Sequence, residues 1–225
     1  MALGLSAQAA PVIDKQLVVN VVQVCTTDGL NCASTGPAGN AFFEAEADKI
    51  WAQAGIDIKF VFTGQLHNSA FFNGSSGVDA PGLYTPPLGT PGTTMFLMNT
   101  VDGAYGNAWV GGPGLAIGMA DVMSFNGGIG RLDTIAHELG HNLGLWHSDF
   151  ADALMAYGNI RNVPGSLADI CPDGMCWDKL YDDEIATARG SSLLIDLPLQ
   201  GVPEPAALGL LALGLLAAAG ARRRS

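Results

Sequence analysis

A run of β-branched residues comes first along the chain, then apolar residues at helical spacing, and then an apolar–polar alternation. Residues 16–24 are rich in β-branched side chains and predict a buried strand. Residues 41–54 carry apolar side chains at helical spacing and are followed by Gly55, which predicts a helix that ends there. Residues 56–62 alternate between apolar and polar side chains. This alternation predicts a second strand.

Glycine, serine, asparagine and proline interrupt the pattern in the middle of the chain. Residues 63–92 predict a long irregular segment, of the kind that forms a functional loop or an insertion. Residues 93–100 predict a third strand, and residues 114–120 predict a fourth, whose glycines allow another backbone to approach. Helices are predicted over 131–143 and 178–189. The order of elements indicates a mixed α/β domain.

Composition places these elements in one acidic domain. The chain has 225 residues, of which 48% are hydrophobic, and residues 11–200 suffice for one domain with a sizeable core. Its 10 basic residues stand against 21 acidic ones, which gives a net charge of −11. This charge argues against nucleic-acid binding. It is typical of a soluble exported protein, and bound Ca²⁺ is the alternative interpretation.

Four cysteines form two closely spaced pairs. Cys25 and Cys32 are separated by six residues, and Cys171 and Cys176 by four. In an exported protein an even count favours disulfides, and the short spacings favour the pairings Cys25–Cys32 and Cys171–Cys176. A zinc site built from all four cysteines is the competing interpretation.

The chemistry of the chain is concentrated in residues 137–147, which read HELGHNLGLWH. The stretch fits the pattern H-E-x-x-H-x-x-G-x-x-H at every fixed position. Those positions are filled by His137, Glu138, His141, Gly144 and His147.

This spacing predicts a catalytic metal site. On a helix, His137 and His141 lie one turn apart on the same face, where two imidazoles can bind one Zn²⁺. Gly144 can adopt the left-handed conformation that ends a helix, so the chain can turn and bring His147 back as a third ligand. Three protein ligands leave the fourth position of zinc open for water, next to the carboxylate of Glu138.

The pattern resembles that of the metzincin clan of zinc endopeptidases. In that clan a tight turn carries a methionine beneath the zinc, and here Met155 follows His147 by eight residues. The short spacing is similar to the matrixin branch, whereas Tyr157 is similar to the tyrosine of the astacin and serralysin branches. The resemblance implies that Met155 forms a hydrophobic floor under the histidines and that Tyr157 hydrogen-bonds the oxyanion of the reacting carbonyl.

The resemblance also implies the fold and the place of the substrate. The expected architecture is α/β (α+β), a metzincin-like zinc-protease fold with a twisted mixed sheet, two main helices and a smaller irregular C-terminal subdomain. The clan holds substrate as a strand added to the sheet edge beside the zinc helix. The second, structural zinc of matrixins is not expected, because His67 is the only histidine outside the motif. The expected edge consists of Gly114, Leu115, Ala116, Ile117 and Gly118.

Both ends of the chain are similar to targeting signals. Residues 1–10 are apolar and end in small residues, as does a secretory signal peptide, and a disordered terminus is the alternative. Residues 201–225 contain Val-Pro-Glu-Pro, an apolar run and three arginines, an order that resembles the PEP-CTERM sorting signal of Gram-negative bacteria. That resemblance implies an exosortase-type processing enzyme and contact with the membrane through the tail until processing. A plain tail anchor is the alternative.

The sequence as a whole predicts an exported zinc-dependent endopeptidase of the cell envelope or the extracellular space. The predicted parts are a signal remnant over 1–10, a catalytic domain over 11–200 and a sorting signal over 201–225. Protein or peptide is the expected substrate, and Glu138 is the expected general base. Two alternatives stay open, namely a zinc-dependent hydrolase of a non-peptide amide and a non-catalytic surface or matrix protein with the same fold.

Overall fold

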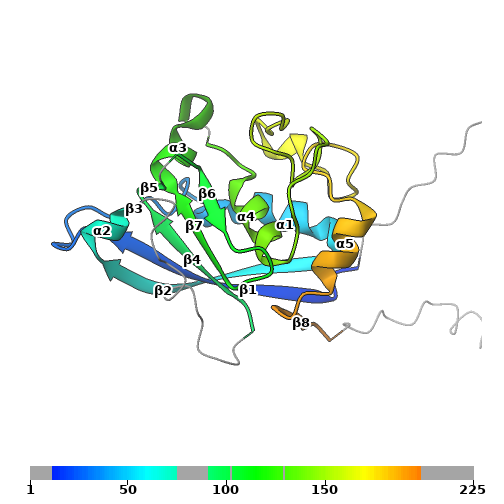
Figure 1. Cartoon of the computed structure of the whole chain (residues 1–225), viewed down its shortest axis with the longest axis horizontal. Coiled ribbons are helices and arrows are strands. Elements are labelled where there is room, and N and C mark those ends of the chain that lie inside the picture. Colours follow the sequence, from blue (N-terminus) through cyan, green and yellow to red (C-terminus); the bar gives the residue numbers. More distant parts are fainter. Residues whose placement is uncertain (1–11, 75–90, 102, 129, 199–225) are drawn as a thin grey trace, which may run out of the picture.

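One mixed β-sheet forms the frame of the protein (Figure 1). The structure, a computed structural model, describes residues 12–74, 91–101, 103–128 and 130–198. Six strands of these residues make up the sheet: β1 (Lys15–Cys25), β2 (Ile56–His67), β4 (Thr93–Met98), β6 (Gly106–Ala108), β7 (Gly114–Gly118) and β8 (Leu194–Asp196).

The strand order is β2-β1-β4-β7-β6, with β8 paired to the start of β1. Neighbouring strands from β2 to β7 run parallel, whereas β6 and β8 are antiparallel to their partners. Parallel neighbours need crossover connections, and the helical segment after β1 provides the one that leads to β2. The central place of β1 explains its long run of β-branched residues, because helices cover one of its faces and strands flank both of its sides.

Helices and short elements follow or connect these strands. The helix predicted over 41–54 is present, but Phe42 and Phe43 have φ values of 60° and 52°, so its regular part begins at Glu44. The other elements are the 3-10 turns η1 (Ala41–Phe43), η2 (Ala52–Ala54) and η4 (Leu167–Asp169), the helices α1 (Glu44–Trp51), α2 (Ser69–Phe72), α3 (Met119–Gly128), α4 (Thr134–Asn142) and α5 (Asp182–Arg189), and the strands β3 (Asn73–Gly74) and β5 (Thr100–Val101).

The main core lies between the sheet and the pair α1 and α4, which Figure 1 shows on the same side of the sheet. Trp51 on α1 is fully buried, and its indole N–H donates to the carbonyl of Ala136 on α4 at 3.3 Å. Ile135 and Leu139 place the apolar face of α4 in the same cluster. This packing fixes α4, the helix that carries most of the motif, against the sheet.

The predicted sheet edge is wrong by one strand. Residues Gly114–Gly118 form β7, but β7 pairs with β4 on one side and with β6 on the other. Its five residues are buried, so this strand is interior to the sheet. The edge of the described sheet beside α4 is the three-residue strand β6.

Two smaller differences concern boundaries. The strand expected over 56–62 extends to His67, and the helix expected over 178–189 begins at Asp182. Between α4 and α5 the described chain has only one short 3-10 turn, which fits the irregular C-terminal part that was expected.

The cysteines form two local disulfides, Cys25–Cys32 and Cys171–Cys176, which are the pairings that their spacing favoured. None of the described helices has the length and apolar character that a membrane span requires. The expected signal remnant over 1–10 and the expected sorting signal over 201–225 lie outside the described residues.

Candidate metal centre

Helix α4 and the turn after it bring three histidines together. His137 and His141 lie one helical turn apart on α4, which ends at Asn142. Gly144 then has a φ of 99°, a conformation that suits glycine, and the chain turns so that His147 faces the helix. The Nε2 atom of His147 lies 3.3 Å from that of His137 and 3.2 Å from that of His141.

Backbone carbonyls orient the two helical imidazoles. Nδ1 of His137 lies 2.8 Å from the carbonyl oxygen of Leu154, and Nδ1 of His141 lies 2.8 Å from that of Leu145. Each Nδ1 therefore carries the proton that it donates, which leaves the lone pair of each Nε2 directed at the shared point.

The three rings fit a tetrahedral divalent metal such as zinc. Zinc–nitrogen bonds of about 2.0–2.1 Å place tetrahedral ligand atoms roughly 3.3–3.4 Å apart, which agrees with the two measured Nε2 separations. Burial lowers the pKa of all three histidines, so their neutral, metal-binding form is favoured. Among the described residues, they are the one group of histidine, cysteine, aspartate and glutamate with such spacing.

The methionine turn packs directly beneath the helix. Met155 is fully buried, and a Cβ added at Gly140 would overlap its sulfur atom. Gly140 lies between the two helical histidines in sequence, so its missing side chain lets the sulfur approach the backbone of α4. The carbonyl of the preceding residue, Leu154, is the one that orients His137.

Glu138 lies beside the histidines and is shielded from solvent. Its side chain is buried, and it packs against Gly106 of β6, where an added Cβ would lie 2.7 Å from the Glu138 Cγ atom. Burial raises the pKa of Glu138 to about 8, against the opposing effect of Arg161 and Arg131. A carboxyl group with a pKa near neutrality is suited to accept and return a proton.

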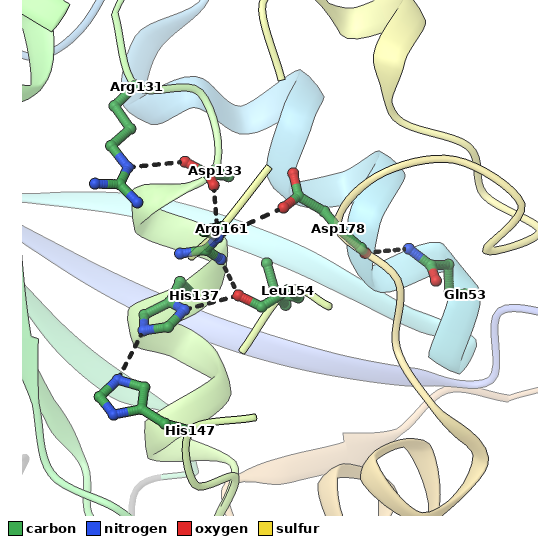
Figure 2. A network of polar contacts seen from close by, with 8 residues as sticks. All are labelled: Gln53, Arg131, Asp133, His137, His147, Leu154, Arg161 and Asp178. Carbon is green, nitrogen blue, oxygen red and sulfur yellow. Dashed lines mark hydrogen bonds and ion pairs between the residues drawn. The ribbon is translucent and has the colours of Figure 1, made fainter. Parts of the chain in front are cut away.

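A buried group of charged residues adjoins the site (Figure 2). Nε of Arg161 lies 2.8 Å from Asp133 and 3.8 Å from Asp178, and one terminal nitrogen of Arg161 donates to the carbonyl of Leu154. Nε of Arg131 lies 3.4 Å from the other oxygen of Asp133. Burial and the neighbouring Asp133 raise the pKa of Asp178 well above its usual value.

The sequence did not reveal this group. The structure shows Asp133 fully buried at the N-terminal boundary of α4 and paired with two arginines. Neither Arg131 nor Arg161 carried a sequence signal, because the two are thirty positions apart and no local motif joins them.

Of the other histidine and tyrosine considered from the sequence, only Tyr157 lies beside the three histidines. The ring of Tyr157 is about half exposed, and its centroid lies 4.7 Å from that of His147. His67 is exposed at the end of β2. The interpretation of the acidic charge as a sign of bound Ca²⁺ stays a prediction.

A cavity of about 340 Å³ opens next to the histidines. Its lining residues are Gly103, Ala104, Tyr105, Gly106, Arg131, Thr134, His137, Glu138, His147, Gly158 and Arg161.

Comparison with protein families gives two matches. Residues 12–148 match the family described as metallo-peptidase family M12B, reprolysin-like. Residues 201–224 match the PEP-CTERM protein-sorting motif. No curated protein matches the chain in sequence.

Solved structures with a similar outline include three peptidases. An archaemetzincin from Methanopyrus kandleri has a TM-score of 0.47 and 11% identity, over 77% of this chain and 94% of that one. A zinc-dependent peptidase from Methanocorpusculum labreanum has a TM-score of 0.45 and 11% identity, over 76% and 99%. Metalloproteinase-II from Bacteroides fragilis has a TM-score of 0.43 and 14% identity, over 80% and 54%.

Proposed function

The chain belongs to the reprolysin-like M12B family of metallopeptidases, and we propose that it is an exported zinc endopeptidase of the metzincin kind. The observation that carries this proposal is the convergence of three Nε2 atoms beside a buried carboxyl group. His137, His141 and His147 would hold the zinc, and Glu138 would act on the substrate.

The reaction proposed is the hydrolysis of a peptide bond. Zn²⁺ at the three Nε2 atoms would polarise the scissile carbonyl and acidify an attacking water. Glu138 accepts one proton of that water while the water oxygen bonds to the carbonyl carbon. Glu138 then returns the proton to the peptide nitrogen as the C–N bond breaks. Tyr157, beside His147, donates its hydroxyl proton in a hydrogen bond to the oxyanion.

Strand β6 is the proposed support for the substrate. It pairs with β7 on one side, and Gly106 lies against Glu138, so a chain that adds to the other side of β6 passes the candidate centre. This proposal replaces Gly114–Gly118 as the substrate edge. An antiparallel addition is favoured, because antiparallel pairs are slightly more stable per residue than parallel ones.

The chain carries a PEP-CTERM motif, and its export is proposed from that motif. The tail over 201–225 would contact the membrane until an exosortase-type enzyme removes it, which leaves the catalytic domain over 11–200 in the envelope or outside a Gram-negative cell. The short segment over 1–10 would be the remnant of the export signal.

The proposal is tested with a Glu138→Gln variant and a mixed peptide library. The parent protein should bind one zinc per chain and cleave peptides, and a chelator should stop the cleavage. The variant keeps the shape of the side chain but lacks the base, so it should keep its zinc and lose activity by about 10²–10⁴-fold. Cleavage within a few-fold of the parent would remove Glu138 from the mechanism. A parent protein that binds zinc and cleaves no peptide would contradict the proposed function.

A further inference from the structure

The cavity beside the candidate metal centre has two arginines in its wall. Arg131 and Arg161 line the same space of about 340 Å³ as His137, Glu138 and His147. Neither arginine has a part in the proposed hydrolysis. Two guanidinium groups at the wall of one small cavity favour an anionic ligand.

Arg161 lies in the wall of this cavity and is almost completely buried. Its side chain is 2% exposed, its Nε pairs with Asp133 at 2.8 Å, and a terminal nitrogen donates to the carbonyl of Leu154. It is held in place by the fold, and its charge is offset by that of Asp133.

Arg131 is both held in place and able to bind. Its Nε lies 3.4 Å from Asp133, and its guanidinium carbon lies 4.6 Å from the ring centroid of Tyr105, which is a cation–π contact. Among the described residues, its terminal nitrogens make no hydrogen bond or ion pair, and Figure 2 shows them turned away from Asp133. A guanidinium group fixed in this way can grip a carboxylate through two parallel hydrogen bonds.

Thr134 adds an unused polar group to the same wall. The residue is 3% exposed and lines the cavity, and its hydroxyl has no hydrogen-bond partner among the described residues. That oxygen is shielded from solvent, so Thr134 supplies no accessible donor, and Arg131 is the group that can reach a ligand.

The strand geometry indicates which substrate residue reaches this cavity. Gly106 lies against Glu138, and residues 103–106, which precede and begin β6, line the cavity. A substrate that runs antiparallel to β6 passes Ala108 first and Gly106 later. Its residue after the scissile bond therefore lies over the cavity.

We propose that this cavity binds the carboxylate of an acidic substrate residue immediately after the scissile bond, and that Arg131 determines this specificity. The inference rests on the proposed endopeptidase function. It names a substrate class for that function, namely proteins and peptides cleaved before aspartate or glutamate.

The first test uses the zinc-loaded full chain and a peptide library that is read on both sides of each cleaved bond. Aspartate and glutamate should be enriched at the position after the bond. In a matched peptide pair that differs only by glutamate or glutamine at this position, kcat/KM should favour glutamate by about tenfold or more. No preference at that position, or a preference for acids only before the bond, would overturn the inference while leaving the peptidase function intact.

Variants assign the preference to Arg131. In Arg131→Gln the glutamate preference should fall to about twofold or less, because the positive charge and the paired N–H donors of the guanidinium group are both lost. In Arg131→Lys, which keeps the charge beside Asp133, the protein should fold as the parent does and keep a reduced preference. Lys59→Gln removes one positive charge from an exposed site on β2 and should keep the parent preference. An unchanged preference in both Arg131 variants would refute the assignment.

A binding measurement makes the inference independent of cleavage. The NMR signal of the Arg131 Nε–H group is identified because it disappears in Arg131→Gln. N-acetylglutamate amide should shift this signal, whereas the neutral N-acetylglutamine amide should not. If the parent cleaves no peptide but this shift is seen, the peptidase proposal fails and the anion site stands. If both ligands leave the signal unchanged at millimolar concentrations, the anion site is refuted.

Discussion

The contact between Gly106 and Glu138 offers a direct test of how the candidate base is positioned. A Cβ added at Gly106 would lie 2.7 Å from Cγ and 2.8 Å from Oε1 of Glu138. Carbon atoms in contact are normally about 3.5–4.0 Å apart, so in Gly106→Ala the carboxylate must move by about 1 Å. The backbone of Gly106 does not have a positive φ, so alanine brings no conformational strain of its own.

We expect Gly106→Ala to lower kcat/KM by about 100-fold with zinc content unchanged. A displacement of about 1 Å in a positioned group costs about that factor, and it lies within the 10²–10⁴-fold attributed to a general base. The assay is steady-state cleavage of one fluorogenic peptide, with metal analysis and thermal unfolding of each variant. Gly165→Ala is the matched control, because its added methyl group would lie 3.6 Å from the nearest atom, at ordinary contact distance.

A double variant decides whether the effect acts through Glu138. With Glu138→Gln already present, Gly106→Ala should lower the residual activity by less than about threefold, since residues that act as a unit are not additive. A full further loss of about 100-fold would show that the methyl group acts on something else, such as the substrate edge. That result would refute the reasoning.

Three further predictions concern zinc binding, the pH dependence of stability and the placement of the protein in the cell. Gly140→Ala should weaken zinc binding by about tenfold or more in competition with a chelator, because the added methyl group would displace the Met155 sulfur and with it the turn that orients His137. Burial raises the pKa of Asp48 to about 6, so its folded-state pKa exceeds the unfolded value and stability falls as pH rises from about 4 to 6. For this half-buried group, Asp48→Asn should therefore raise the unfolding free energy by about 1 kcal/mol at neutral pH and change it little at about pH 3, in urea titrations at both pH values. A chain that ends at Gly201 should keep its peptidase activity and leave the cell envelope, which fractionation would detect.

The local features of the site could be predicted from the sequence. His137 and His141 are one helical turn apart, which defines two expected ligands. Gly144 marks the end of the helix and therefore the turn that brings His147 back as the expected third ligand. The strand β1 was visible as a run of β-branched residues, and the helix α1 was visible from apolar side chains at helical spacing.

Features that depend on tertiary contacts could not be predicted in this way. Strand β6 has three residues, Gly-Asn-Ala, which is too short for any period, and so the sheet edge was assigned to the longer β7. The ion pair of Arg161 with Asp133 joins segments twenty-eight positions apart, and only the packed fold brings them together.

The buried charges tie the candidate metal centre to residues that follow the motif. The carbonyl of Leu154 accepts from both His137 and Arg161, and Arg161 in turn pairs with Asp133 at the start of α4. Removing one partner of a buried ion pair costs about 3–5 kcal/mol, so the helix start, the methionine turn and the loop that carries Asp178 are held in one arrangement. The family match ends at residue 148, whereas Leu154, which orients His137, and Arg161, which contacts Leu154, lie beyond that residue. The C-terminal loops therefore orient His137 through Leu154 and place Arg161 in the wall of the cavity.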